Sequence, residues 1–442
     1  MKELTKKAIK EFQENYQQNP VQKVLRKALV KNPIKDIATV FEAQQNVNYK
    51  FSIDLDTLSP NNQRSTGRCW LFAGLNVLRE QAAKRYNLKN VEFSQNYQAF
   101  WDKFEKINFF LQAMDDFLSC DDDDDRTLKY LLRQGIQDGG QWDMFVSLVN
   151  KYGVVPKDVM PETHSSSNTY FLNRLINIRL RKYAKEARTL YAENKENQIA
   201  TLKETTLKEL YGLLCTALGI PPKNFNFEYV DKDKKYHLLK DLNPISFYQD
   251  LKIDLDEYAS VIHAPTKDKP FMKNYTVAYL GNVVGGKLIN HLNLPMERVE
   301  ELILAQLKAG EVVWFGCDVS FYNDRETGIW DDQSYDYDST FQIDFQMSKE
   351  DRLDYLQGAM NHAMVITGVN LIDEKPTKWK IQNSWGEEKG EKGYYLMSQS
   401  WFLEHTYQAV VHQKYLTKEE LAAYNQKPVV LKPWDPIGSL AK

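Results

Sequence analysis

The residues after Cys69 constrain the fold most, because their spacing predicts a helix with a thiol in its first turn. Apolar side chains recur behind this cysteine at helical spacing: Phe72, Leu75, Leu78 and Ala82. Unpaired backbone N–H groups and the positive end of the helix dipole favour a thiolate there. Ser65 or Thr66 is expected to cap the turn. The pattern alone fits a buried structural cysteine equally well, since free cysteine packs as a small hydrophobe.

Composition predicts a soluble globular protein. The 442 residues suit two or three subdomains or one elaborated domain. Hydrophobic residues make up 43% and charged residues 26%. The 57 Lys and Arg residues against 60 Asp and Glu residues give a net charge of -3, which disfavours nucleic acid as an obligate partner. No apolar stretch follows the first residues, so we expect neither a signal peptide nor a membrane span.

The cysteines and acidic residues indicate no metal site. Four scattered cysteines form no Cys-x-x-Cys pair, and neither a disulfide framework nor a zinc site is indicated: Cys69, Cys120, Cys215 and Cys317. The run Asp121–Asp125 lacks the glycine and distal glutamate of a calcium loop, so we interpret it as a solvated loop or a helix start. We expect no cofactor and a reduced, cytoplasmic location.

Helical patterns dominate the first half of the chain, and strand patterns appear in the second. Helices are expected over 1–31, with a break near Pro20, and over 69–86 and 94–118. Strands are expected over 51–56, 311–316, 363–369, 379–383 and 393–397. The proline-rich segment 432–442 is predicted to form neither a helix nor a central strand.

The segment 165–260 is predicted to be a helical subdomain with a basic face. Its apolar face carries Leu172, Leu175, Ile176, Tyr183, Ala184 and Ala187. The rest of this helix carries Arg174, Arg179, Arg181, Lys182, Lys185 and Arg188. A solvated surface is the simplest interpretation of the basic face, and nucleic-acid binding is the minor alternative.

Two distant residues give Cys69 chemical partners. His362 precedes an apolar strand, and imidazole is the usual base for a thiol. In the strand expected over 379–383, Asn383 lies on the same inward face as Trp379 and Ile381. An inward Asn needs hydrogen-bond partners. A ring N–H of His362 would satisfy it, and Trp385 would shield this bond from water. A structural histidine and a simple strand-to-turn junction remain the alternatives.

Gln63 completes a set of residues that carries a family resemblance. It lies six positions before Cys69, where its amide and the Cys69 N–H could stabilise an oxyanion. Gln-x5-Cys-Trp, a later His before a strand and Asn-Ser-Trp-Gly together resemble papain-like cysteine peptidases. The run 138–142, Asp-Gly-Gly-Gln-Trp, is similar to the wall of the papain cleft. The resemblance implies substrate contacts for Gly139, Gly140 and Trp385.

The chain is longer than papain between its catalytic residues. His362 follows Cys69 at about twice the separation of about 130–150 residues found in papain-like enzymes, so 165–260 is the expected insertion. This long form resembles the bleomycin hydrolase and bacterial aminopeptidase C family in four segments: 67–73, 281–286, 313–318 and 361–365.

The resemblance implies an α+β, papain-like cysteine peptidase fold, with a helical left subdomain and a β-rich right subdomain. Five parts are expected: 1–60, an N-terminal segment packing on the catalytic core; 61–164, the helical subdomain with the nucleophile; 165–260, a helical insertion for assembly; 261–415, the β-rich subdomain with His and Asn; and 416–442, a C-terminal arm. It also implies peptide substrates, a cytoplasmic homohexamer, and no membrane or metal.

The resemblance also implies that the C-terminal arm decides which peptides are accepted. In the family it lies in the cleft, where its terminal carboxylate holds the free α-amine of the substrate, which implies an intracellular cysteine aminopeptidase. Here the anchor is Ala441 or Lys442, because some related tails carry one further Lys that is trimmed off. A retained Lys442 would repel the substrate amine. The alternatives are a cysteine endopeptidase of the same family, a non-peptidase hydrolase or acyltransferase that uses the same dyad of Cys69 and His362, and a nucleic-acid-binding protein.

Overall fold

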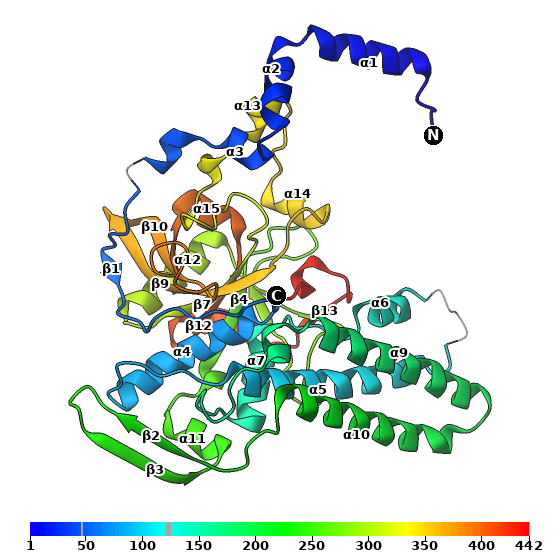
Figure 1. The fold of residues 1–442 in the computed structure, drawn as a ribbon, viewed down its shortest axis with the longest axis vertical. Helices are drawn as coiled ribbons and strands as arrows, with labels where there is room; N and C mark the ends of the chain where they lie inside the picture. The colour runs from blue at the N-terminus through cyan, green and yellow to red at the C-terminus, as the bar shows by residue number, and fades with distance from the viewer. Residues whose placement is uncertain (46, 121–124, 442) are drawn as a thin grey trace.

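A large mixed sheet lies beside a group of long helices in the computed structural model, which describes residues 1–45, 47–120 and 125–441 (Figure 1). Ten strands follow the order β13-β5-β6-β4-β12-β7-β9-β10-β11-β8, and β1 pairs with β9. Their bounds are β1 (Ile53–Asp54), β4 (Tyr258–Ile262), β5 (Lys273–Val277), β6 (His291–Asn293), β7 (Val313–Cys317), β8 (Ile329–Trp330), β9 (His362–Ile372), β10 (Lys375–Gln382), β11 (Tyr394–Ser398), β12 (Thr406–His412) and β13 (Val429–Leu431).

The central strands separate two hydrophobic cores, since alternate side chains point to opposite faces of a sheet. Ala363 and Val365 of β9 pack in the core that contains helix α4 (Cys69–Arg85). Met364 and Ile366 pack in the other core, with helix α12 (Met296–Lys308). Strand β9 therefore joins the helical and β-rich parts of the molecule, and its first residue is His362.

The helix that begins at Cys69 is more deeply buried than its sequence suggested. The spacing predicted one apolar face, but 14 of the 17 residues of α4 are buried, Asn76 and Arg79 among them. It packs against α5 (Gln95–Ala113), α7 (Trp142–Tyr152) and β9. Asn76 hydrogen-bonds Asn61 and Gln382, and Arg79 donates to the carbonyls of residues 58 and 59. Backbone and amide partners thus allow this helix to bury polar side chains.

The insertion contains helices and a β-hairpin. Its elements are α8 (His164–Ser167), α9 (Tyr170–Ala192), α10 (Ile199–Leu218), β2 (Phe225–Val230), β3 (Tyr236–Leu242) and α11 (Pro244–Asp250). The helical description of 165–260 is therefore wrong for 225–242, where buried Phe225 and Phe227 alternate with exposed residues. Leu175, expected on the buried face of α9, is exposed.

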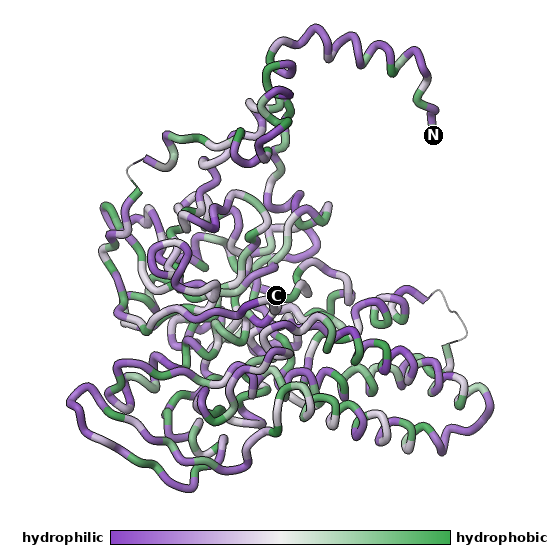
Figure 2. Tube along the Cα trace, in the orientation of Figure 1, coloured by the Kyte–Doolittle hydropathy of each residue, from purple (hydrophilic) through white to green (hydrophobic). Residues whose placement is uncertain are grey.

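The N-terminal helices project from the body of the molecule (Figure 1). As expected, the helical segment breaks at Pro20: α1 (Lys6–Gln18) is followed by α2 (Pro20–Leu29), which Asn19 caps. Neither helix buries a residue, so the expected packing of 1–60 on the core is wrong for this part. Figure 2 shows a mainly hydrophilic α1 with scattered hydrophobic positions, and Ile9 and Phe12 are exposed.

The remaining helices are short. They are α3 (Ile34–Ala38), α6 (Arg126–Gln134), α13 (Tyr337–Phe341), α14 (Lys349–Asp354), α15 (Gln399–His405) and α16 (Lys418–Tyr424). Asp125 caps α6, in agreement with the expected helix start, whereas Asp121–Asp124 lie outside the described residues. Among the helices that the structure describes, none is long and apolar enough to cross a lipid bilayer.

Candidate active site

Cys69 is the first residue of α4, as the apolar spacing predicted. The expected cap by Ser65 or Thr66 is wrong. Arg68 occupies the cap position, but its side chain bonds Glu162 and does not cap the helix, and the Thr66 hydroxyl donates to the carbonyl of Gln63 at 2.7 Å. Among the described residues the start of α4 has no side-chain cap, and the Cys69 thiol lies beside the first N–H groups at the positive end of the helix.

Burial disfavours the thiolate form of Cys69. The residue has no exposed surface, and burial raises the pKa of its thiol to about 12. The backbone N–H of Ala363 opposes this shift, because it can hydrogen-bond the sulfur. Ala363 directly follows His362, so the thiol lies against the start of β9.

His362 is held by Asn383 as predicted. Nε2 of the ring lies 2.9 Å from Asn383 Oδ1, which also accepts from the Ser384 N–H at 2.8 Å. An amide oxygen only accepts, so Nε2 carries the proton and Nδ1 is the nitrogen left for chemistry. Trp385 stacks on the ring with 4.9 Å between centroids, in the expected shielding position.

Burial disfavours the charged form of both Cys69 and His362. Burial lowers the pKa of His362 to about 4, although the bond to Asn383 raises it. No hydrogen bond joins the Cys69 sulfur to this ring in the described part of the chain. Burial penalises each charge taken alone, whereas a thiolate and an imidazolium formed together attract one another. Such contacts commonly tighten when substrate binds.

Gln63 is fixed beside the dyad by Ser384. The Gln63 side-chain oxygen accepts from the Ser384 hydroxyl at 2.6 Å, and its backbone N–H donates to the Ser384 carbonyl at 2.8 Å. Its Nε2 donates to the carbonyl of Thr66 at 2.6 Å, which leaves one of two N–H groups for a ligand. Ser384 lies inside the Asn-Ser-Trp-Gly motif, but nothing in the sequence around it indicated this contact with Gln63.

The glycine wall of the cleft packs directly on helix α4, which begins at Cys69. A Cβ on Gly140 would lie 2.4 Å from Cε2 of the buried Trp70 ring, so only glycine fits there. Lys106 donates to the carbonyl of Gly139 at 2.7 Å and to Asp102 at 2.7 Å. The two glycines are therefore held rigidly beside the helix that carries Cys69.

Asp138 anchors this wall to three other segments, a role for which its place in the motif was the single signal in the sequence. The carboxylate accepts from Lys103 at 2.5 Å, from Asn173 of α9 at 2.8 Å and from the Gly67 N–H at 3.0 Å, and Thr169 donates as well. Burial raises the pKa of this carboxyl, but Lys103 and the hydrogen bonds outweigh burial and hold it well below its ordinary value.

The C-terminal arm ends against the same wall. The Gly140 N–H donates to the carbonyl of Ala441 at 3.1 Å, and Gln141 Nε2 donates to the carbonyl of Ser439 at 2.6 Å. The Ser439 hydroxyl bonds the carbonyl of Met360, two residues before His362, at 2.7 Å. Ala441 is fully buried, and Lys442 lies outside the described residues. The arm thus bridges both sides of the cleft close to the dyad.

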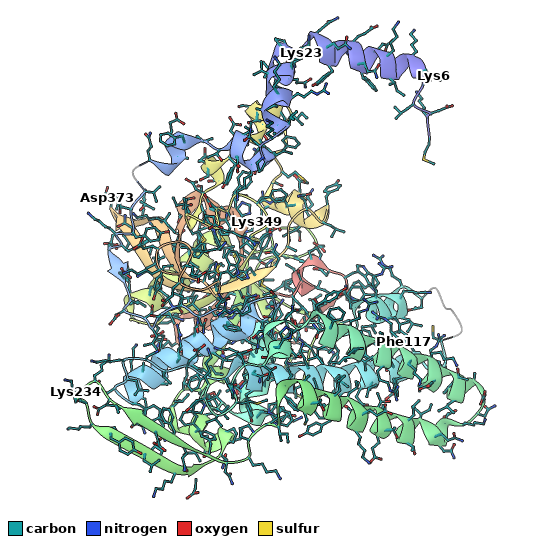
Figure 3. All side chains as sticks on the ribbon, in the orientation of Figure 1. Lys6, Lys23, Phe117, Lys234, Lys349 and Asp373 are labelled. Atoms are coloured by element: carbon teal, nitrogen blue, oxygen red, sulfur yellow. The ribbon has the colours of Figure 1, made fainter. Side chains whose placement is uncertain are left out.

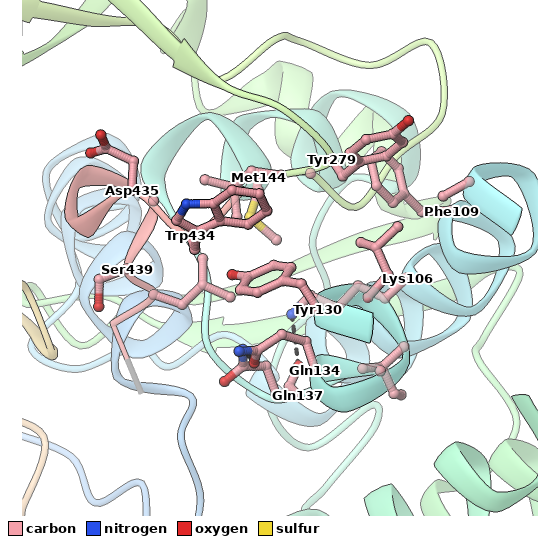
Figure 4. Close-up of a pocket in the computed structure, with 18 of the residues that line it drawn as sticks. Lys106, Phe109, Tyr130, Gln134, Gln137, Met144, Tyr279, Trp434, Asp435 and Ser439 are labelled. Atoms are coloured by element: carbon pink, nitrogen blue, oxygen red, sulfur yellow. Dashed lines mark hydrogen bonds between the residues drawn. The ribbon is translucent and has the colours of Figure 1, made fainter. Parts of the chain in front are cut away.

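A cavity of about 340 Å³ lies beneath the arm (Figure 4). Trp434, Asp435 and Ser439 of the arm line it on one side, and Tyr130 and Met144 line it from helices α6 and α7. Arg126 covers the Trp434 ring at 3.8 Å, which fixes the base of the arm on α6.

The basic face of α9 is partly occupied by partners within the protein. Arg179 pairs with Glu209 at 2.7 Å, and Arg181 donates to the carbonyl of Leu132 at 2.8 Å. Within residues 1–45, 47–120 and 125–441, no group of three or more His, Cys, Asp or Glu side chains could hold a metal ion.

Known proteins resemble this chain along its whole length. The sequence model of the Peptidase C1-like family matches residues 3–438. Aminopeptidase C of Lactobacillus delbrueckii subsp. lactis is 46% identical, with 100% of this chain and 99% of that protein covered. Aminopeptidase C of Listeria monocytogenes is 44% identical, with 99% of each covered. The crystal structure of pepw from Lactobacillus rhamnosis HN001 has a TM-score of 0.97 at 46% identity and covers 99% of both chains.

Proposed function

The chain belongs to the peptidase C1-like family and is a papain-like cysteine peptidase of α+β fold, and from this premise we propose that it is a cysteine aminopeptidase. It would release N-terminal residues from peptides through a thioester. The observation that carries this proposal is the arm, which ends at Gly140 beside helix α4, the helix that carries Cys69. A substrate chain has little room to continue beyond its first residue on that side.

In the proposed reaction Cys69 is the nucleophile and His362 the proton carrier. The sulfur adds to the carbonyl carbon of the first peptide bond, and the thiol proton passes to Nδ1 of His362. The free N–H of Gln63 and the backbone N–H of Cys69 stabilise the oxyanion. The C–N bond then breaks as His362 protonates the leaving nitrogen. Water, deprotonated by His362, hydrolyses the thioester and restores the thiol.

Asn383 and Trp385 support this cycle without reacting. The hydrogen bond from Nε2 to Asn383 keeps Nδ1 directed at the reacting atoms through both proton transfers. Trp385 keeps water from that bond. Gly139 and Gly140 would let the substrate backbone approach the wall closely, since neither carries a side chain.

The arm is proposed to select substrates with a free N-terminus. Its last carboxylate, on Lys442 or on Ala441 after trimming, would pair with the α-ammonium of the substrate. The antiparallel bridge between Ala441 and Gly140 supports this, because the arm occupies the wall as a peptide strand would. If Lys442 stays, its ammonium opposes substrate binding.

Deletion of residues 439–442 tests the proposal. The deletion is expected to lower kcat/KM for leucine arylamide at least tenfold and to raise it for the matched N-acetylated dipeptide arylamide, because the anchor and the block disappear together. Cys69→Ala, as the control for the chemistry, should abolish both activities. An unchanged preference after the deletion would refute the arm's role. A wild type that prefers the acetylated substrate would establish the endopeptidase alternative. The intact mass of the protein reports whether Lys442 is retained.

We also propose that the protein is a homohexamer in the cytoplasm, with its active sites facing a central cavity and with neither membrane nor nucleic acid as a partner. Support for assembly comes from α1 and α2, which bury no residue and expose Ile9, Phe12, Val21 and Val24. A helix with exposed apolar residues is better stabilised against a second surface than in water. Sedimentation of the full chain, compared with a variant that lacks residues 1–30, tests this assembly.

A further inference from the structure

Arg325 lies beside the dyad on the side of the cleft that the arm leaves open. Its guanidinium carbon lies 4.6 Å from the centroid of the Trp385 ring, and that ring lies 4.9 Å from the His362 ring. The guanidinium carbon of Arg325 therefore lies no further from the centre of the His362 ring than the sum of these two distances. The arm bonds Gly140, Gln141 and Met360 instead.

The hydrogen-bonding capacity of Arg325 is unused. Its side chain is exposed, and within the described residues it makes no ion pair and no hydrogen bond. The neighbouring carboxylates are engaged elsewhere, since Glu326 pairs with Lys389 at 2.5 Å and Asp324 accepts from the Glu326 N–H at 2.9 Å. Stacking on Trp385 restricts the guanidinium while its five N–H donors stay available.

We propose that Arg325 binds the free α-carboxylate of short peptide substrates on the leaving-group side. This inference rests on the proposed aminopeptidase function. His362 must reach the leaving nitrogen, so the leaving residues extend past its ring and over Trp385. An extended chain advances roughly 3.3–3.6 Å per residue, so one or two leaving residues bring the carboxylate to Arg325. The guanidinium fork matches a carboxylate in geometry and charge.

The proposal defines a substrate class, namely dipeptides and tripeptides read at both ends. The arm would hold the α-ammonium and Arg325 the α-carboxylate, with the scissile bond over Cys69 between them. Longer peptides would place a neutral peptide group at Arg325 and lose the second contact. The enzyme would then favour the short products that other peptidases release.

The test compares Leu-Gly-Gly with Leu-Gly-Gly-amide, which differ only in the carboxylate. The wild type is expected to cleave the free acid about five- to tenfold more efficiently by kcat/KM, as one exposed charge-assisted contact allows. Arg325→Met keeps an unbranched stem and should bring the ratio of the two kcat/KM values to about one. Arg325→Lys keeps the charge without the fork and should give an intermediate ratio. The wild-type ratio should also fall with added salt.

Lys6→Met is the matched control, since it removes an exposed cation from α1, which projects from the body of the molecule (Figure 3), and it should keep the wild-type ratio. An Arg325→Met enzyme with the wild-type ratio would overturn the proposal, and so would equal losses on both peptides. Cleavage of leucine arylamide by the wild type is measured in parallel. If that cleavage is absent, the aminopeptidase function fails, whereas a normal rate with an unchanged ratio refutes Arg325 alone.

Discussion

Replacing Asp138 with Asn perturbs the structure at the junction of three segments. The substitution keeps the shape of the side chain and removes its charge. Lys103, whose side chain is 2% exposed, then loses its ion-pair partner at 2.5 Å. The new amide group must also face a donor, either Asn173 or the Gly67 N–H, because all the present partners of Asp138 donate to it.

The expected loss of stability follows from the buried Lys103 cation, which Asp138→Asn leaves without its partner. Removing one partner of a buried ion pair typically lowers the free energy of unfolding by about 3–5 kcal/mol. Unfolding entropy of about 2.1 cal/mol/K per residue gives about 0.9 kcal/mol/K for 442 residues. For cooperative unfolding of the whole chain, Tm should therefore fall by about 3–5 °C.

The pH dependence has a definite sign. The folded pKa of Asp138 lies below its unfolded value, so the carboxylate stabilises the fold above about pH 4 and this contribution is lost as the pH falls further. The difference in stability between wild type and Asp138→Asn should thus be largest near pH 7 and shrink below pH 4. Because Gly67 leads into Cys69, the variant should also show reduced kcat/KM.

Calorimetry at several pH values, with a denaturant series at pH 7, measures these effects. Glu204→Gln is the control, since it breaks an exposed helical pair with Lys208 and should leave Tm unchanged. Adding Lys103→Met to Asp138→Asn removes the unpaired cation, so the double variant should lose less than the sum of the single losses. A loss under about 1 kcal/mol, or two stability curves that stay parallel to pH 3, would refute the reasoning.

Two further substitutions probe the cleft. Ser384→Ala frees the carboxamide of Gln63 and should lower kcat/KM about fivefold, mainly through kcat, in line with the loss of one hydrogen bond of about 1 kcal/mol. Ser400→Ala, which loses a hydrogen bond to Asp332, is the control. Equal effects of the two substitutions on steady-state kinetics would contradict the role of Ser384. Gly140→Ala places a methyl group against Trp70, which should lower the free energy of unfolding by about 1–3 kcal/mol and reduce the rate of arylamide cleavage. A variant with the wild-type Tm and rate would show that the glycine wall can move.

The parts of the site that follow local rules could be predicted from the sequence. Helical spacing placed Cys69 at a helix start, and strand alternation turned Asn383 inward, where it meets His362. Both depend on neighbours within a few residues. The cap of α4 was mispredicted, because the Thr66 hydroxyl found a closer acceptor in the carbonyl of Gln63, a local competition that propensity does not resolve.

Long-range contacts could not be predicted in this way. Nothing near Arg325 in the sequence indicates that its side chain stacks on Trp385. The role of Ser384 is visible only in the fold, where its hydroxyl bonds the side chain of Gln63. The hairpin at 225–242 could not be separated by pattern from the helices that precede it. Its alternation of buried phenylalanines was present in the sequence, but short apolar runs fit helix and strand alike.

Asp138 also changes how the insertion should be understood. A segment added to a papain-like core for assembly alone would contact that core through exposed side chains. Here Thr169 and Asn173, both at the start of α9, donate to the carboxylate that holds the glycine wall and the loop before Cys69. Removing the insertion would leave Asp138 and Lys103 with fewer buried partners and would thereby destabilise the glycine wall of the cleft. The insertion is therefore part of the framework that positions Cys69.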